Sequence, residues 1–175
     1  GSMHEVGFVE GEIDENTPTN PLSLYGISKD ALRKSLQLLE KEYSFCFQWI
    51  RGFYIVSNTA KGSSIFSKLI QACNRNEKEF PFTSGLNKYD FISYEDLCEQ
   101  IASVVSQKYV NGIINCCSGK AVPLKDAVEG FIKDNDLDIK LMYNAFPDRI
   151  YDSKEVWGNI SKIQRILQNQ INEEV

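Results

Sequence analysis

The 175-residue sequence contains a single histidine, His4, and this scarcity weighs against several kinds of catalytic site. A centre with several histidine ligands needs more of them, and a Ser-His-Asp triad needs a central histidine held within the fold. The five cysteines show no C-x-x-C spacing, and they are Cys46, Cys73, Cys98, Cys116 and Cys117. Their odd number and apolar surroundings favour reduced core residues over a disulfide framework or a zinc site. We therefore expect a cytoplasmic chain without metal ligands.

Long apolar runs and an excess of positive charge are also missing. No apolar run approaches the roughly 18 residues that a membrane-spanning helix needs. Lys and Arg together number 19 and Asp and Glu number 24, which gives a net charge of −5. A nucleic-acid-binding module depends on cations placed near phosphates, and this balance disfavours one. We expect neither nucleic acid nor a membrane as a partner.

Length and composition indicate one globular domain. Hydrophobic residues make up 42% of the chain and charged residues 25%, which is ordinary globular usage. We interpret residues 1–3 (Gly-Ser-Met) as the remnant of an expression tag and residues 4–175 as a single domain. Residues 4–23 are rich in polar residues and proline, which predicts a loop that leads into a helix.

Beyond that loop, helical and extended patterns alternate along the chain. Residues 24–41 carry Ile27, Leu32, Leu36 and Leu39 at helical spacing, and further helices are expected at 65–74, 94–105, 124–133 and about 160–171. The nearly continuous apolar run 45–56 predicts a strand that is buried on both faces. Other strands are expected at 80–82, 89–92, 112–117 and 139–143. The alternation predicts an α/β fold with a mainly parallel sheet and flanking helices.

Tyr25 and Lys29 are four residues apart at the start of the first helix, so both side chains rise from one face. A tyrosine with a pKa of about 10 needs a preference for phenolate of ~4 kcal/mol to titrate near pH 7. One cation ~4 Å away at an effective dielectric constant of ~20 supplies about that much. The pair could therefore carry proton transfer, although the same spacing alone also suits a solvated lysine beside a half-buried tyrosine.

The residues around this pair favour the first interpretation. Residues 15–29 read ENTPTNPLSLYGISK and resemble the E-x-x-P-x-x-P-x-S-x-Y-G-x-S-K segment of extended short-chain dehydrogenases/reductases. These proteins are NAD-dependent nucleotide-sugar epimerases, dehydratases and reductases. Further segments resemble the family in the same order along the chain: residues 50–57, 89–97, 115–120, Arg149 with Asp152, and 161–162. The resemblance runs from about His4 to Leu167, and an unrelated α/β domain with a chance motif remains the alternative.

The resemblance implies a role for particular residues. Tyr25 would exchange a proton with a sugar hydroxyl or ketone, and Lys29 would activate it and hold the cofactor ribose. The substrate would be a nucleotide-diphosphate sugar, with Tyr54, Tyr89, Arg149 and Asp152 as substrate-binding residues and Arg149 on the diphosphate. A surface arginine is the alternative for Arg149. The third catalytic group of the family, a Ser or Thr, aligns with Ser2.

Several features depart from the family pattern. Tyr54 stands where the family usually has an Asn, and Tyr89 stands where an Arg commonly meets the nucleotide, so we expect an altered substrate pocket. Asp90 could be purely structural, capping the turn before the next helix. The glycine-rich dinucleotide turn of the family is absent, and a βαβ unit of about 30 or more residues does not fit before Tyr25.

The resemblance therefore implies the C-terminal part of an NAD- or NADP-dependent enzyme. By itself this part would bind no cofactor and show little activity. The alternative is a non-catalytic sugar-nucleotide-binding or oligomerisation module of the same fold. The resemblance implies that a homodimer would form through the helix that carries Tyr25 and Lys29 and the helix after the next strand.

Overall fold

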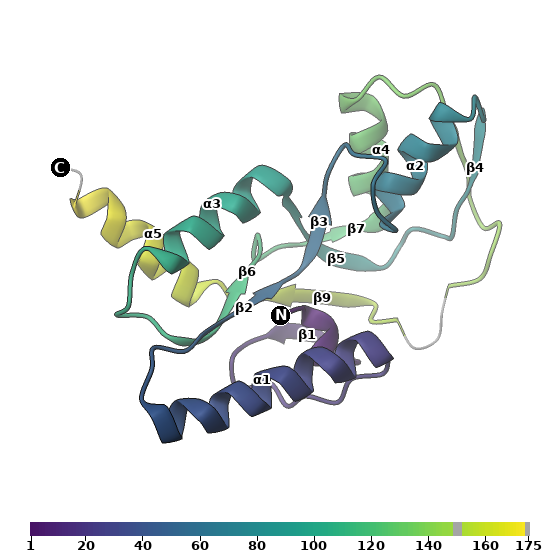
Figure 1. Ribbon diagram of the computed structural model, residues 1–175. Coiled ribbons are helices and arrows are strands. Elements are labelled where there is room, and N and C mark those ends of the chain that lie inside the picture. The colour runs from purple at the N-terminus through teal and green to yellow at the C-terminus, as the bar shows by residue number, and fades with distance from the viewer. Residues whose placement is uncertain (149–151, 174–175) are drawn as a thin grey trace.

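The chain folds as an α/β structure in which most strand pairs are parallel, as the alternating pattern predicts (Figure 1). This computed structural model describes residues 1–148 and 152–173. In chain order its elements are the 3-10 turn η1 (Met3–Glu5), β1 (Gly11–Ile13), α1 (Leu24–Tyr43), β2 (Gln48–Gly52), β3 (Tyr54–Val56), α2 (Ile65–Asn74), β4 (Glu79–Pro81), β5 (Lys88–Ser93), α3 (Tyr94–Val105), β6 (Gly112–Cys116), β7 (Ala121–Pro123), α4 (Leu124–Asp134), β8 (Lys140–Met142), β9 (Glu155–Gly158) and α5 (Ser161–Glu173).

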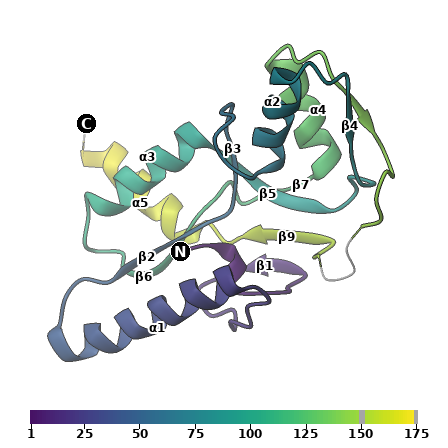
Figure 2. The same ribbon diagram turned by 45° about the vertical axis from the view of Figure 1, so that its right-hand side comes forward.

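The strands form three small sheets. The largest has the order β1-β9-β5-β3, with β7 added antiparallel to β5. The other two are the parallel pairs β2-β6 and β4-β8. Both views show α3 and α5 side by side on one side of β2 and β6 and α1 on the other, with α2 and α4 gathered at the far end of the molecule (Figures 1 and 2).

The β2-β6 pair is buried on both faces because its residues alternate between two different neighbours. Ile50, Ile114 and Cys116 pack in one apolar cluster with residues of α3 and α5. Trp49 and Ile113 point the other way and pack against Leu36 of α1. The expectation of a strand covered on both sides is therefore confirmed for β2.

The expected single strand over 45–56 is wrong in one respect, because it is broken into β2 and β3. β2 pairs with β6, whereas β3 pairs with β5 in the other sheet. The break falls at Phe53, whose buried ring packs with Met3, Val6 and Ile13 rather than continuing the pattern of β2. A continuous apolar run cannot show this change of partner, since both halves are extended and apolar.

The N-terminal segment, expected to be a loop, is more ordered than its composition indicates. It contains η1 and β1, and β1 pairs in parallel with β9. Ser2 and Met3 are buried, and Ser2 forms an isolated parallel bridge with Gly52 of β2. Residues 2 and 3 thus contribute to the packing of this end of the molecule.

The cysteines only partly match the expectation of core residues. Cys116, the last residue of β6, and Cys117, which follows it, are buried as expected. Cys46 and Cys98 are exposed, because Cys46 lies in the connection before β2 and Cys98 lies on the outer side of α3. Among the described residues, no helix combines the length and apolar character that crossing a membrane requires.

Helix α1 turns mainly polar residues inward and most of its apolar residues outward. Its buried residues are Gly26, Asp30 and Arg33. Ile27 and Leu32, which belong to the apolar repeat that predicts the helix, are each 50% exposed, whereas Leu36 of the same repeat packs against Trp49 and Ile113. The spacing of apolar residues thus predicts the helix correctly, but most of the repeat lies on the side that faces away from the rest of the chain.

Candidate active site

The start of α1 is set by local sequence, and it places Tyr25 in the first helical turn. Ser23 is the N-cap, and its Oγ accepts a hydrogen bond from the Gly26 N–H at 3.1 Å. Gly26 faces the N-terminal turn so closely that a Cβ there would lie 2.4 Å from the carbonyl oxygen of His4. A glycine at this position therefore allows α1 to pack against η1.

A cavity of about 350 Å³ opens beside this turn. Tyr25 of α1, Tyr54 of β3, Tyr89 of β5 and Asp152 all line it, so the structure brings four of the predicted site residues together. The rest of its lining is Met3, His4, Gly7, Phe8, Leu22, Ser23 and Ser153. Arg149, the remaining predicted substrate-binding residue, lies outside the described residues.

Tyr25 and Lys29 contact each other as their spacing predicts. The Lys29 Nζ lies over the ring of Tyr25, 5.6 Å from the ring centroid. Tyr25 is 52% exposed, which leaves its side chain accessible to a ligand in the cavity. The ammonium thus sits over the face of the phenol ring, where a cation is attracted to the π-electrons.

Tyr54 and Tyr89 form an aromatic wall of the cavity. Their ring centroids are 4.7 Å apart, and Tyr54 also contacts Phe91 at 5.8 Å. Burial raises the pKa of Tyr54 well above its usual value, with further contributions from the charges of Tyr89 and Asp152. Tyr54 therefore stays protonated at physiological pH, and its hydroxyl can donate a hydrogen bond.

His4 is a residue of this site that the sequence pattern did not indicate. Its imidazole lies edge-to-face with Tyr25 at 6.2 Å and with Tyr54 at 5.8 Å between ring centroids. Desolvation lowers the pKa of His4 below its ordinary value, and the negative charge of Asp152 opposes the shift. A lone histidine near the N-terminus carries no spacing signal, so only the tertiary fold reveals its position.

Ser2, which aligns with the third catalytic group of the resembling family, does not line the cavity. It is 8% exposed, and its Oγ accepts a hydrogen bond from the His4 N–H at 3.3 Å. The geometry thus gives Ser2 a structural contact within η1.

Asp90 is structural, but it does not cap the turn before α3 as expected. Its fully buried carboxylate accepts hydrogen bonds from the N–H and hydroxyl of Ser118 at 2.8 and 2.7 Å, and from the N–H groups of Gly119 at 2.9 Å and Gly158 at 3.1 Å. Ser93 caps α3 instead. Asp90 therefore ties β5 to the segment after β6 and to β9.

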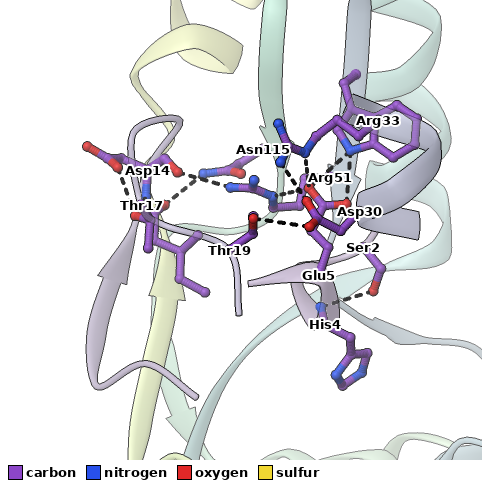
Figure 3. A network of polar contacts seen from close by, with 12 residues as sticks. Ser2, His4, Glu5, Asp14, Thr17, Thr19, Asp30, Arg33, Arg51 and Asn115 are labelled. Atoms are coloured by element: carbon purple, nitrogen blue, oxygen red, sulfur yellow. Dashed lines mark hydrogen bonds and ion pairs between the residues drawn. The ribbon is translucent and has the colours of Figure 1, made fainter. Parts of the chain in front are cut away.

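A buried network of charges lies behind the site, between η1, α1 and β2 (Figure 3). The Glu5 carboxylate accepts hydrogen bonds from Arg51 Nε at 2.9 Å and from Trp49 Nε1 at 3.0 Å. Arg33 of α1 lies 3.7 Å from Glu5 and donates to Asp30 at 2.6 Å. This network links the turn that carries His4 to the helix that carries Tyr25.

Comparison with known proteins places these features in a family. The model of the NAD dependent epimerase/dehydratase family matches residues 1–117. The dTDP-6-deoxy-L-talose 4-dehydrogenase (NAD(+)) of Aggregatibacter actinomycetemcomitans is 43% identical over 159 residues, which is 90% of this chain and 58% of that protein. A putative UDP-glucose 4-epimerase of Methanocaldococcus jannaschii is 28% identical over 128 residues, covering 69% of this chain and 41% of that protein.

Solved structures agree with the sequence matches. The UDP-glucuronic acid 4-epimerase of Bacillus cereus in complex with NAD superimposes with a TM-score of 0.79 at 18% identity, covering 96% of this chain and 52% of that one. At this identity the likeness shows the fold alone. The chain spans about half the length of the relatives that it matches. Because the family model matches well over half of the sequence, the chain belongs to the NAD dependent epimerase/dehydratase family.

Proposed function

We propose that this chain is the sugar-binding and proton-transferring part of an NAD(P)-dependent enzyme, an epimerase, dehydratase or reductase that acts on a nucleotide-diphosphate sugar. The observation that carries this proposal is the single cavity that gathers Tyr25, Tyr54, Tyr89 and Asp152 beside Lys29. These residues come from segments far apart in the sequence, and the family membership supports a shared role for them.

In the proposed mechanism, Tyr25 exchanges one proton with the substrate. In the oxidative direction its phenolate takes the proton of a sugar hydroxyl while the carbon of that hydroxyl loses a hydride, so that the alcohol becomes a ketone. In the reverse direction the phenol returns the proton to the ketone oxygen. The positive charge of Lys29, over the ring of Tyr25, favours the phenolate during this exchange. When bound, a nicotinamide dinucleotide supplies the hydride acceptor or donor.

The residues present fit one end of such a cofactor. The phenol of Tyr25 and the ammonium of Lys29 lie together at the start of α1 and would hold the ribose next to the nicotinamide. The sequence contains no glycine-rich strand-turn-helix that would bind the pyrophosphate at a helix N-terminus. We therefore propose that the dinucleotide binds only when such a segment is joined to this chain. Calorimetric titration of the chain with NAD⁺ should give no micromolar binding, and a micromolar Kd would contradict this point.

The aromatic wall bears on the choice of sugar. Tyr54 and Tyr89 present two rings, tilted by 43° to each other, where the resembling family usually has polar residues. The apolar faces of such rings suit a sugar that carries a methyl group in place of a hydroxymethyl group, because a hydroxyl placed against them would lack a hydrogen-bond partner. The relative from A. actinomycetemcomitans is named for a dTDP-6-deoxyhexose and for position 4 of the sugar. We propose a dTDP-6-deoxyhexose that reacts at C4, with Asp152 on the sugar and Arg149 on the diphosphate.

Replacement of Tyr25 by Phe tests the mechanism. In the enzyme that joins this chain to a dinucleotide-binding segment, Tyr25→Phe should lower kcat by about 10²- to 10⁴-fold, because general acid-base catalysis is lost. Substrate affinity should change little, since the ring is kept. Tyr43→Phe, at the exposed end of the same helix, is the matched control and should leave kcat unchanged. Unchanged turnover in Tyr25→Phe would remove Tyr25 from the mechanism.

A second role, self-association, is favoured by the outer face of α1. Leu24, Ile27 and Leu38 are between 50% and 86% exposed, and together they form an apolar surface along the helix. Such surfaces often mark contacts with other proteins, and we propose a second copy of the chain as the occupant. Light scattering should show a dimer that Leu38→Glu converts to a monomer, whereas Leu86→Glu on a distant loop should not. A monomer in the unmodified chain would refute this role.

A further inference from the structure

The only histidine of the chain lies in the candidate active site, and the proposed mechanism gives it no task. His4 lines the cavity, with its imidazole 6.2 Å from the ring of Tyr25 and 5.8 Å from the ring of Tyr54. Its side chain is exposed on the cavity side. His4 therefore stands between the proposed proton-transferring group and the aromatic wall, where a bound sugar would lie.

The contacts of its neighbours fix this position. The Ser2 hydroxyl accepts a hydrogen bond from the His4 backbone, and the next residue, Glu5, is held by Arg51 and Trp49 of β2. Figure 3 shows the imidazole pointing away from the buried network, while the Glu5 carboxylate points into it. The backbone of η1 is thus anchored from behind, and the His4 side chain is directed toward the cavity.

We propose that His4 is a substrate-contacting residue whose imidazole hydrogen-bonds a hydroxyl of the sugar next to the hydroxyl that exchanges its proton with Tyr25. It would supply a polar contact with the sugar that the buried Ser2, which does not line the cavity, does not supply. This inference rests on the proposed function, since it assumes that the cavity receives the sugar.

The charge state of His4 suits this contact. The titratable groups that share the cavity with it are Tyr25 on α1, Tyr54 on β3, Tyr89 on β5 and Asp152 before β9. Desolvation lowers the pKa of His4 and Asp152 only opposes this, so the imidazole is neutral at physiological pH. A neutral imidazole has one donor and one acceptor nitrogen, and a sugar hydroxyl offers the matching acceptor and donor.

Proton NMR can test the contact directly, because a single histidine gives a single Cε1–H signal in this chain. The probe is the 6-deoxyhexose nucleotide dTDP-L-rhamnose, and dTDP without the sugar is the control. We expect dTDP-L-rhamnose to shift the His4 signal and the ring signals of Tyr54 and Tyr89, and dTDP alone to leave the His4 signal in place. If the tyrosine signals move with dTDP-L-rhamnose and the His4 signal does not, the role of His4 is refuted and the proposed function stands. If none of these signals moves, sugar binding in this cavity is itself refuted, and the His4 contact with it.

Variants separate a contact with the sugar from a structural role. His4→Ala should weaken dTDP-L-rhamnose binding about three- to tenfold in calorimetry, the loss expected for one hydrogen bond, and should leave dTDP binding unchanged. His4→Gln keeps a donor and an acceptor and should restore part of the affinity. Ser2→Ala should bind both probes as the unmodified chain does. The proposal would be overturned if His4→Ala bound dTDP-L-rhamnose as tightly as the unmodified chain, or if it lost equal affinity for dTDP-L-rhamnose and for dTDP. If His4→Ala does not fold, the NMR titration decides.

Discussion

The ion pair between Glu5 and Arg51 offers the sharpest test of how this structure is held together. Both side chains are fully buried, and Glu5 Oε1 lies 2.9 Å from Arg51 Nε. Arg51 also donates to the carbonyl oxygen of Asp14 at 3.0 Å. Burial lowers the pKa of Arg51, and the charge of Glu5 opposes the shift, as expected for a cation that depends on its partner. We therefore expect Arg51→Met to be strongly destabilising, because it leaves Glu5 buried without its nearest counter-charge.

The size of the effect follows from the environment of the pair. Removing one partner of a buried ion pair costs about 3–5 kcal/mol, a large share of the ~5–15 kcal/mol that stabilises a typical domain. Arg33, which lies 3.7 Å from Glu5, stays in place and offsets part of this loss, so we expect about 3 kcal/mol for Arg51→Met. The double variant Glu5→Leu/Arg51→Met removes both charges, so it leaves neither one buried without a partner. Its loss of stability should be about 1–3 kcal/mol smaller than the sum of the losses in the two single variants.

Urea unfolding, followed by fluorescence and circular dichroism, measures these free energies and completes the double-mutant cycle. Lys78→Met is the control, because Lys78 and Asp138 form an ion pair in which both side chains are mostly exposed. It should leave stability unchanged within error. A cost below about 1 kcal/mol for Arg51→Met, together with an additive cycle, would show that the pair is hydrated and would refute the reasoning.

Three further changes test other contacts around the site. Gly26→Ala should lower the free energy of unfolding by about 1–3 kcal/mol, because the new Cβ would lie 2.4 Å from the carbonyl oxygen of His4. Gly130→Ala in α4 is the control, and it should raise the free energy of unfolding by up to ~1 kcal/mol because the space at its Cβ is open. Asp90→Asn should cost about 3 kcal/mol in urea unfolding, because an amide accepts fewer of the four hydrogen bonds that the carboxylate receives. The pKa of His4 is lower in the folded chain than its ordinary value of 6.5, so as the pH falls the imidazole is protonated in the unfolded chain before it is protonated in the folded chain. The free energy of unfolding should therefore decline as the pH drops from 6.5 toward the pKa of His4 in the folded chain. His4→Gln should abolish this decline, and an identical pH profile would contradict the assigned shift.

The positions of the long elements could be predicted from local pattern, but their partners could not. The helices at 65–74, 94–105 and 124–133 match α2, α3 and α4 closely, because each carries an apolar repeat that faces the core. The short strands β1, β7 and β9 are not predicted, because β1 and β9 contain glycine and charged residues, β7 ends in proline, and each depends on pairing with a strand distant in the sequence. Phe53 ends β2 because of where its ring packs, which depends on residues at the N-terminus.

The site shows the same division between local and long-range information. Tyr25 and Lys29 were found because they are one helical turn apart within a specific motif. His4 was missed because its position depends on Glu5 meeting Arg51, 46 residues away in the sequence. No local spacing predicts such a contact, and the mixed, mostly polar sequence around His4 has no helical or strand period.

The inward-facing charges of α1 have a consequence for Tyr25. Apolar contacts are non-directional, whereas hydrogen bonds and ion pairs require defined distances and angles. Asp30 accepts a hydrogen bond from the Thr19 hydroxyl at 3.2 Å, and Arg33 lies 3.7 Å from Glu5, so contacts with two other segments hold the helix at one rotation about its own axis. A shift by one residue would rotate the helix by about 100° and turn Tyr25 out of the cavity. An apolar inner face would oppose that rotation less, so the charged face determines which way the proposed catalytic tyrosine points.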